Sequence, residues 1–226
     1  MPFQYESVMP WGRSFDEYRR MFALAPQELN LKILGCGDGP AAFNAAMARL
    51  SRRVVSCDPL YQLSCSPFRS RIDAAFEEVM AKVRENYDKL VWTFIQSPEE
   101  LGRLRIEAME QFLSDFALGK RQGRYVAAEL PHLPFPPATF DIALCSHFLF
   151  LYSDRVSLEF HLQSIEAMCA VAREARIFPL LTYNAELSPH LEPLLDELAR
   201  RGYRASVSSV PYEFLRGADK MLKVSR

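Results

Sequence analysis

Short apolar runs alternate with amphipathic stretches along most of the chain. The first apolar run, residues 31–34, meets a glycine-rich stretch at residues 35–40, and a segment rich in helix-forming side chains follows at residues 41–50. A second apolar run at residues 54–57 ends at an Asp-Pro pair, and a proline at that place terminates a strand. The pattern predicts a strand, a tight turn, a helix and a second strand, which together form a βαβ unit that closes at Asp58.

A helix-start signal precedes this unit. Ser14 and Glu17 have the spacing of a capping box, in which each side chain bonds the backbone N–H of the other residue. Phe15, Tyr18 and Phe22 fall on one stripe of such a helix. We expect a short amphipathic helix near the N-terminus.

Residues 61–123 follow a helical pattern throughout. Large apolar side chains recur every three or four positions over residues 72–94, which predicts one long amphipathic helix. Ser97 then supplies an N-cap before a proline, and Gly119 marks the end of a second helical stripe. Two helices without a strand between them interrupt the alternation of strands and helices. We therefore interpret residues 61–123 as an inserted helical hairpin, a lid within one domain that spans residues 1–226.

The second half of the chain resumes the alternation. A turn-rich loop with prolines separates its first two strand-like runs, and its last two runs lie on either side of a polar turn. The expected elements, in chain order, are strands at residues 125–128 and 140–145, a helix at 156–173, a strand from 176, a helix between 188 and 202, and strands at 204–210 and 220–224. The fold class is therefore α/β, and the chain ends in an antiparallel hairpin.

Composition and charge narrow the classes of function. The chain carries 27 Lys and Arg against 28 Asp and Glu, a formal net charge of −1, so we expect neither nucleic acid nor a membrane as a partner. The longest apolar run is too short to cross a bilayer, and residues 1–10 lack the pattern of a secretory signal, which predicts a cytoplasmic protein. The 5 cysteines have no metal-ligand spacing, so we expect reduced thiols and no metal site.

The glycine turn and the acid after the second strand form a candidate ligand site. A glycine-rich turn between a strand and a helix presents backbone N–H groups at the positive end of the helix dipole, with no Cβ in the way of a ligand. An acid about 20 residues further on, at the end of the next strand, is placed to accept hydrogen bonds from both hydroxyls of a ribose. Gly35, Gly37 and Asp58 have this relation, and packing of the helix on the strand is the alternative for the glycines alone. Pro40 stands where a dinucleotide-binding turn has its third glycine, which disfavours NAD.

Several segments together resemble class I S-adenosylmethionine-dependent methyltransferases. Residues 32–40 are similar to the glycine-rich first motif of that superfamily, and residues 55–58 are similar to its ribose-binding strand end. Residues 128–135 and 140–144 resemble its third-strand and fourth-strand signature, and residues 145–148 resemble the edge of its methyl-transfer site. The combination of these segments, rather than any one of them, makes the resemblance specific.

The resemblance covers residues 31–58 and 123–226, and it implies a fold, an activity and a cofactor. The implied fold is Rossmann-like, with a mostly parallel seven-stranded sheet, an antiparallel last strand and helices on both faces. The implied activity is methyl transfer from S-adenosylmethionine, with S-adenosylhomocysteine as product. The near-zero net charge, the lack of a nucleic-acid-binding motif and the expected lid favour a small molecule as the methyl acceptor. Asp58 would hold the ribose, and Glu129 with the backbone of Leu130 would read the adenine. The residues assigned to the cofactor in this way are Gly35, Cys36, Gly37, Asp38, Asp58, Glu129, Leu130 and Ser146.

One position departs from the pattern of the superfamily. Its first motif usually begins with an acid that binds the amino group of the methionine portion. In one register Gly35 takes the place of this acid, and in the other register Ile33 does. Asp38 is the candidate to supply the missing carboxylate.

Candidates for contact with the methyl acceptor lie in two places. Ser146 and His147 follow the fourth expected strand, where the crevice of such a sheet lies. His147 is a candidate general base or substrate ligand, and a packing histidine is the alternative. Arg13 and Tyr18, with Trp11, belong to the N-terminal segment that we expect to close over the site.

The sequence is also compatible with two other functions. One is an oxidoreductase of the NAD-binding type, because unrelated functions share such sheets. The other is a module that binds the cofactor without catalysis, which the missing acid of the first motif makes credible. The absence of an obvious base excludes nothing, because methyl transfer is driven mainly by positioning. A homo-oligomer is also left open.

Overall fold

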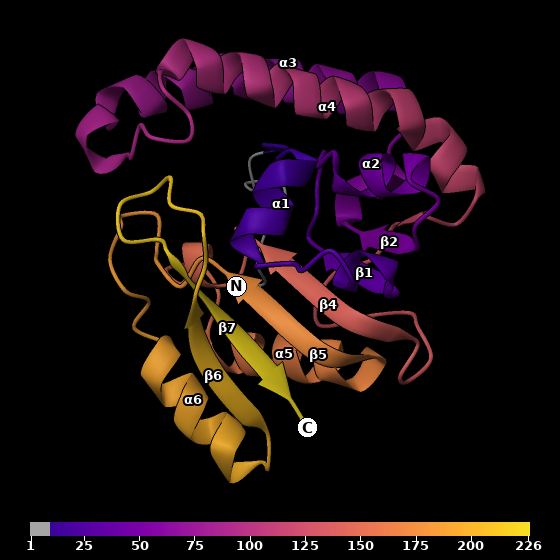
Figure 1. The fold of residues 1–226 in the computed structure, drawn as a ribbon, viewed down its shortest axis with the longest axis vertical. Helices are drawn as coiled ribbons and strands as arrows, with labels where there is room; N and C mark the ends of the chain where they lie inside the picture. The colour runs from indigo at the N-terminus through magenta and orange to yellow at the C-terminus, as the bar shows by residue number, and fades with distance from the viewer. Residues whose placement is uncertain (1–9) are drawn as a thin grey trace.

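A computed structural model describes residues 10–226, and its centre is a seven-stranded sheet (Figure 1). The strand order is β3 (Tyr125–Val126), β2 (Val54–Cys57), β1 (Ile33–Cys36), β4 (Phe140–Ser146), β5 (Ala172–Phe178), β7 (Lys220–Ser225) and β6 (Arg204–Ser209). The strands from β3 to β5 are parallel, whereas β7 runs antiparallel to both β5 and β6. This confirms the predicted mostly parallel sheet with an antiparallel last strand.

Helices cover the sheet and one of its ends. They are α1 (Phe15–Met21), α2 (Phe43–Arg49), α3 (Cys65–Glu85), α4 (Pro98–Arg121), α5 (Leu158–Val171) and α6 (Leu191–Arg200), with short 3-10 turns η2 (Glu28–Asn30), η3 (Pro59–Gln62), η4 (Tyr87–Lys89) and η5 (Phe150–Tyr152). The predicted capping box is present at α1, because Ser14 and the side chain of Glu17 bond each other's backbone N–H. No helix in residues 10–226 is both long and apolar enough to cross a membrane.

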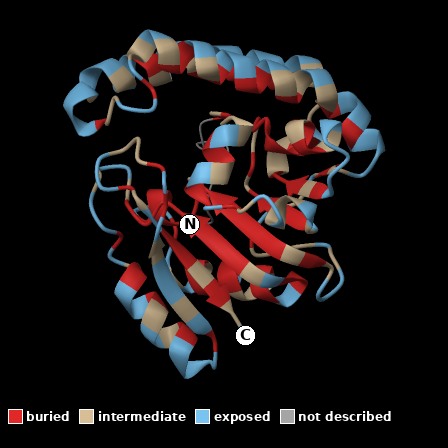
Figure 2. Ribbon diagram, viewed as in Figure 1, coloured by how far each residue is buried: buried red, intermediate tan, exposed pale blue. Residues whose placement is uncertain are grey.

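Each face of the sheet has its own core, because successive side chains of a strand point to opposite faces. Leu34 on β1 belongs to a buried cluster that includes Ile165 of α5 and Leu194 of α6. Its neighbour Ile33 belongs to the cluster on the other face, which includes Phe43 of α2 and residues of α1. In Figure 2 the buried residues fill the sheet between these helices. The ends of the central strands are thereby held at fixed positions.

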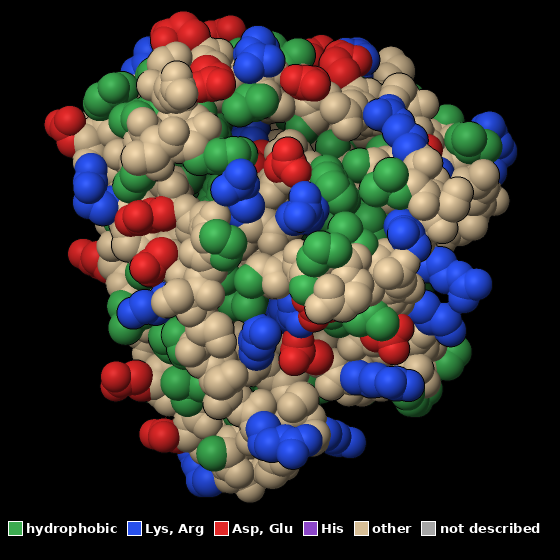
Figure 3. Space-filling model, viewed as in Figure 1, with side chains coloured by type: hydrophobic (Ala, Val, Ile, Leu, Met, Phe, Trp, Pro, Cys, Tyr) green, Lys and Arg blue, Asp and Glu red, His purple; other side chains and the backbone are tan. Residues whose placement is uncertain are grey.

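The helices α3 and α4 lie side by side across the end of the sheet to which the arrowheads of β4 and β5 point (Figure 1). They share a buried cluster that includes Phe68 and Ile72 of α3 and Phe112 and Phe116 of α4. Their outward faces are exposed and carry charged side chains of both signs (Figures 2 and 3). The two predicted helices between the second and third strands are therefore present. That residues 61–123 are an insertion and act as a lid stays a prediction.

The predicted first helix of this pair was too long. The helix ends at Glu85, and residues 90–94, which continue the apolar spacing, lie outside it. Leu90 instead forms a β-bridge with Leu215, and the Val91 N–H donates to the carbonyl of Phe214. This segment thus pairs with the loop between β6 and β7. Helical periodicity alone cannot distinguish such a segment from one face of a helix.

Three other boundaries differ from the prediction. The helix α4 continues through Gly119, where we expected it to stop, and ends at Arg121; Gly119 instead leaves room for the ring of Tyr125. The other two differ for reasons of strand pairing. The strand β3 covers residues 125–126 and not 125–128, because its partner β2 ends at Cys57, opposite Val126. The helix α5 ends at Val171, before the predicted residue 173, because Ala172 pairs with Phe140 and already belongs to β5. Residues 1–9, on which part of the cytoplasmic prediction rests, lie outside the described residues.

Candidate functional site

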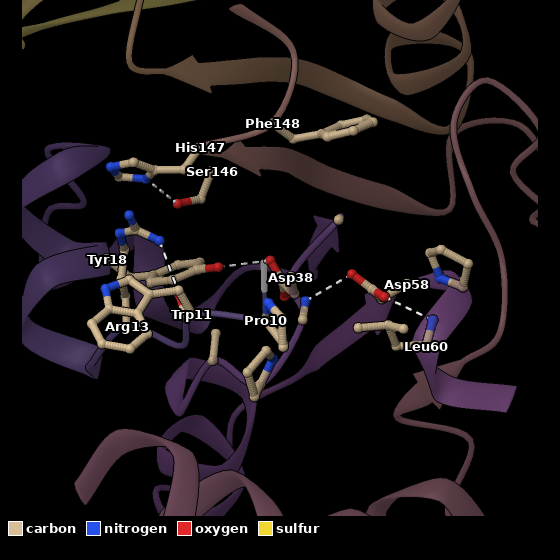
Figure 4. A pocket seen from close by; sticks show the side chains of 15 residues that line it. Pro10, Trp11, Arg13, Tyr18, Asp38, Asp58, Leu60, Ser146, His147 and Phe148 are labelled. Atoms are coloured by element: carbon tan, nitrogen blue, oxygen red, sulfur yellow. Dashed lines mark hydrogen bonds between the residues drawn. The ribbon is translucent and has the colours of Figure 1, made fainter. Parts of the chain in front are cut away.

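A cavity lies at the carboxyl ends of β1, β2 and β4 (Figure 4). Its lining comes from four segments far apart in the sequence: residues 10–13 with Tyr18, residues 37–41 after β1, residues 58–60 after β2, and residues 146–148 after β4. The strand order reverses direction between β1 and β4, and ligands of open α/β sheets bind at such a switch point. Seven predicted site residues meet here, namely Gly37, Asp38, Asp58, Ser146, Arg13, Tyr18 and His147.

The turn after β1 depends on its glycines. Gly37 has φ +66° and Gly39 has φ +51°, a region in which a side chain strains the backbone. Both registers of the first motif place glycine at these two positions. In the register with glycines at 35, 37 and 39, Ile33 stands in the place of the missing acid. Ile33 is fully buried in the apolar core, so it offers a ligand no polar contact.

The carboxylate of Asp38 occupies the space beside Gly35. A Cβ built on Gly35 would lie 1.8 Å from Oδ2 of Asp38, so only glycine leaves room for this carboxylate. The hydroxyl of Tyr18 donates to Oδ1 at 2.8 Å, and the hydroxyl of Ser56 donates to Oδ2 at 2.6 Å. Burial raises the pKa of Asp38 to about 6, against the effect of these two donors. A carboxylate is thus present at the first motif, although it comes from a different position.

Asp58 holds the turn after β1 to the turn after β2. Its Oδ2 accepts the N–H of Gly39 at 2.9 Å, and its Oδ1 accepts the N–H of Leu60 at 2.8 Å. Burial raises the pKa of Asp58 to about 6, and the nearby Asp38 adds to the rise. Each carboxylate oxygen has a second lone pair, so Asp58 can still accept bonds from two hydroxyls. The structural role of the acid and the ribose-binding role are therefore compatible.

His147 follows β4 in an unusual backbone conformation. Its φ is +52°, and its N–H donates to the carbonyl of Phe178 at 2.6 Å, which ties the end of β4 to the end of β5. Nδ1 of the ring lies 2.9 Å from Oγ of Ser146. Burial, with Arg13 and Arg105 nearby, holds the pKa of His147 well below 6.5. The imidazole is therefore neutral at pH 7, and these surroundings make it a weaker base than a free imidazole.

Arg13 is the cation of this cavity. Its Nη1 donates to the carbonyl of Trp11 at 3.1 Å, whereas its Nε is buried and has no hydrogen-bond partner among the described residues. Burial and the neighbouring Arg105 lower the pKa of Arg13 from 12.5. In Figure 4, Arg13, Trp11 and His147 lie on one side of Asp38, and Asp58 and Leu60 lie on the other.

Four predicted cofactor residues do not line this cavity. Gly35 and Cys36 belong to β1 beneath it, and Cys36 is fully buried. Leu130 is buried in the core on one face of the sheet, and Glu129 is exposed in the loop after β3. The contact of Glu129 and Leu130 with adenine stays a prediction.

Sequence reasoning missed Ser56 as a site residue. It is buried in β2, where it donates to Asp38 and accepts a bond from the side-chain amide of Asn44 at 3.1 Å. A hydroxyl inside an otherwise apolar strand was the signal for such a role. The hydroxyl of Tyr18 donates to Asp38 and its ring stacks on Phe43. The predicted contact of Tyr18 with the substrate stays a prediction.

The cavity has a volume of about 60 Å³, well below the roughly 300 Å³ at which pockets for small organic ligands begin. A water molecule takes up about 30 Å³ of liquid volume, so this space is water-sized. A larger ligand requires its walls to move apart. The N-terminal segment around Trp11 and Arg13 is one such wall, and Trp11 in turn contacts Phe76 of α3, with ring centroids 5.6 Å apart.

Known proteins similar to this chain include one sequence relative and two solved structures. No family model matches the chain. It is 28% identical over 219 residues to an uncharacterized protein of Methanocaldococcus jannaschii, with 95% of each chain covered. It is similar to the pyocyanin biosynthetic protein PhzM, with 16% identity and a TM-score of 0.47, over 94% of this chain and 54% of PhzM. It thus spans about half the length of PhzM.

The second structure is magnesium protoporphyrin IX methyltransferase (ChlM) from Synechocystis PCC 6803 with bound S-adenosylmethionine. The identity is 12% and the TM-score 0.43, over 98% of this chain and 93% of ChlM. The topology of the sheet itself carries the assignment. Its strand order β3-β2-β1-β4-β5-β7-β6 with an antiparallel β7 is that of the class I S-adenosylmethionine-dependent methyltransferases, and this chain therefore has their fold.

Proposed function

We propose that this protein transfers a methyl group from S-adenosylmethionine to a small molecule. The observation that carries the proposal is the pair of buried carboxylates, Asp38 and Asp58, on either side of the glycine turn at the switch point of the sheet. The cofactor has a cationic sulfonium, an ammonium and two ribose hydroxyls, and each of these favours a carboxylate neighbour. Residues 37–39 approach without a Cβ at either glycine, which fits close contact with the methionine portion.

The same carboxylates argue against the NAD alternative. A pyrophosphate beside two buried carboxylates places like charges together at low dielectric, which is costly. Pro40 at the third glycine position points the same way. The alternative of a module without catalysis loses its main support, because Asp38 places a carboxylate at the first motif.

The chain's own residues have distinct roles under this proposal. Asp58 accepts the ribose hydroxyls, and Asp38, held by Tyr18 and Ser56, accepts the ammonium group. The cofactor supplies a methyl group already activated by its sulfonium. His147 lies at the edge of the site and is neutral; although its surroundings weaken it as a base, it is the side chain placed to take a proton from the acceptor when the accepting atom carries one. Residues 10–13 and the helices α3 and α4 beyond them exclude water.

Thermal unfolding with candidate ligands tests the proposal. S-adenosylhomocysteine at about 100 times its Kd is expected to stabilise the folded protein by about 2.7 kcal/mol and to raise Tm, whereas NAD and NADP leave Tm unchanged. A rise with NAD alone would overturn the proposal. A rise with S-adenosylhomocysteine, followed by no methyl transfer to any fraction of a small-molecule extract, would favour the module without catalysis.

Substitution of His147 by asparagine is expected to lower kcat with little change in the affinity for S-adenosylhomocysteine. Asparagine tolerates a positive φ better than most residues, so the φ of +52° is retained, whereas the basic ring nitrogen is lost. Loss of a general base costs about 100- to 10,000-fold in rate. Steady-state kinetics and calorimetric titration measure the two quantities. An unchanged kcat would mean that His147 has only a packing role.

Hydrogen exchange tests the lid interpretation of residues 61–123. Because the cavity of about 60 Å³ must open and close around a cofactor, S-adenosylhomocysteine is expected to increase protection in residues 61–71 and in at least one of α3 and α4. Residues 191–200 of α6, which line neither cavity, serve as the internal reference. Protection confined to residues 35–58 and 129–147 would make the helical pair a packing or oligomer element.

A further inference from the structure

A second cavity of about 290 Å³ adjoins the first one. Its walls come from residues 79–90 of α3 and the turn after it, residues 178–184 after β5, and residues 212–218 between β6 and β7. Trp11, Arg13 and His147 line both cavities and therefore form their common boundary. None of the acids that hold the first cavity together belongs to the second one.

The position of this cavity follows from the strand order. Asp58 follows β2, the glycine turn follows β1, and His147 follows β4, so they lie in a row along the carboxyl edge of the sheet. The next strand in the row is β5, and residues 178–184 after it line the second cavity. The second cavity thus continues the row on the side away from Asp58. A methyl acceptor at this place would meet the cofactor beside His147.

The lining of the second cavity combines apolar surface with positive charge. Aromatic and aliphatic side chains dominate it, among them Tyr212, Phe214 and Val83. Its ionic side chains at neutral pH are Arg13, Lys82 and Lys89, and no Asp or Glu is among the lining residues that the structure describes. Lys82 pairs with Glu78 at the surface, which leaves Arg13 and Lys89 as the cations without a carboxylate partner there.

The Arg13 guanidinium lies where a bound anion is most favourable. Its buried Nε lacks a hydrogen-bond partner among the described residues, and such a donor costs free energy until a ligand accepts from it. The nearby Arg105 is paired with Glu17, so the Arg13 guanidinium is the charge in this region that lacks a carboxylate partner among the described residues. An anionic group at the boundary of the two cavities would accept a hydrogen bond from its Nε and pair with its charge.

We infer that the second cavity binds the methyl acceptor, and that this acceptor is a small molecule with a flat apolar body and an anionic group held by Arg13. This inference rests on the proposed function, because the cavity can bind a methyl acceptor only if the protein is a methyltransferase. The apolar body packs against the aromatic lining between α3 and the β6–β7 loop. Lys89 adds to the positive potential at the far wall.

An anionic fluorophore tests this inference on the full chain saturated with S-adenosylhomocysteine. The probe is 8-anilinonaphthalene-1-sulfonate, and its uncharged counterpart is N-phenyl-1-naphthylamine. We expect the anionic probe to bind with a stoichiometry of about one per chain and about tenfold more tightly than the neutral one, since a bond to a charged group contributes about 1.5 kcal/mol or more. Equal affinities of the two probes would overturn the anionic specificity.

Cavity-filling variants locate the binding. Val83→Trp places an indole in the second cavity and is expected to weaken the anionic probe about tenfold, because it removes the space for the apolar body. Val207→Trp, at a position 41% exposed on β6 and outside the cavity, is the matched control and is expected to change nothing. Unchanged binding in a folded Val83→Trp protein would overturn the location.

The variant Arg13→Met tests whether Arg13 binds the anionic group of the acceptor or the carboxylate of the cofactor. We expect about tenfold weaker binding of the anionic probe and an affinity for S-adenosylhomocysteine within about threefold of the parent protein. A larger loss for S-adenosylhomocysteine than for the probe would assign Arg13 to the cofactor and overturn this part. Absent probe binding with intact S-adenosylhomocysteine binding refutes only the acceptor site, whereas absent S-adenosylhomocysteine binding refutes the proposed function.

Discussion

Substitution of Arg105 by methionine is expected to destabilise the folded protein by about 3–5 kcal/mol, the usual cost of leaving one partner of a buried ion pair alone. Arg105 of α4 and Glu17 of α1 are each 1% exposed. The two guanidinium Nη atoms donate to the two carboxylate oxygens at 2.5 and 2.6 Å, and the Tyr212 hydroxyl donates to Glu17 at 2.8 Å. This contact joins the N-terminal helix, the helical pair and the β6–β7 loop, so its loss affects both cavities.

Urea unfolding with two companion variants checks this expectation. The double variant Glu17→Gln with Arg105→Met is expected to be more stable than Arg105→Met alone, because it keeps the acceptor for Tyr212 and removes the unpaired charge. Arg69→Met breaks a pair between α3 and α4 that is exposed on both sides, and it is expected to leave stability almost unchanged. If Arg69→Met and Arg105→Met destabilise equally, the buried pair has no special role.

The pH dependence of unfolding has a definite sign for this pair. Burial alone would raise the pKa of Glu17, but Arg105 outweighs it and lowers this pKa from 4.5 to about 2. A depressed pKa in the folded state means that the pair's contribution is complete above about pH 4.5 and is lost as the pH falls toward 2. Between pH 5 and 3 the parent protein should therefore lose more stability than the double variant. Parallel curves would contradict the assignment.

The capping box shows how far sequence reasoning extends. The spacing of Ser14 and Glu17 predicts a helix start, and the structure confirms it. The same carboxylate also binds Arg105, 88 positions away, and this contact leaves no local signal. Nothing in the sequence pattern around Arg105 distinguishes it from the exposed charges of an amphipathic helix. Local rules predict elements, whereas the burial of a charge depends on which distant segment covers it.

The candidate site shows the same limit. The glycine turn and Asp58 follow from chain order, because the carboxyl ends of parallel strands share one edge of the sheet. That Asp38 fills the space beside Gly35 follows only from the path of the turn and from donors on α1 and β2. The second cavity is less predictable still, since its walls come from segments more than 100 positions apart. Apolar periodicity at residues 90–94 even favoured a helix where the chain instead pairs with the β6–β7 loop.

Substitution of Asp58 by alanine is expected to weaken binding of the cofactor by about 1–3 kcal/mol, or roughly 5- to 150-fold in Kd, because hydrogen bonds from two hydroxyls to a charged acceptor are lost. Calorimetric titration with S-adenosylhomocysteine measures the change. Asp196→Ala, at an exposed position on α6, is the matched control and should leave Kd unchanged. An unchanged Kd in a folded Asp58→Ala protein would remove this residue from the site.

The same residue makes the affinity depend on pH in a predictable direction. Burial raises the pKa of Asp58 to about 6 in the free protein, so part of the population is protonated there at and below pH 6. Ribose hydroxyls bind the ionised form better, which lowers this pKa in the complex and releases a proton on binding. Affinity should therefore rise from pH 5 to pH 7 and then level off. Asp38, with a pKa also about 6, contributes in the same sense through the ammonium group. Asp58→Asn should thus weaken the pH dependence without abolishing it, and a full slope in that variant would assign the whole effect to Asp38.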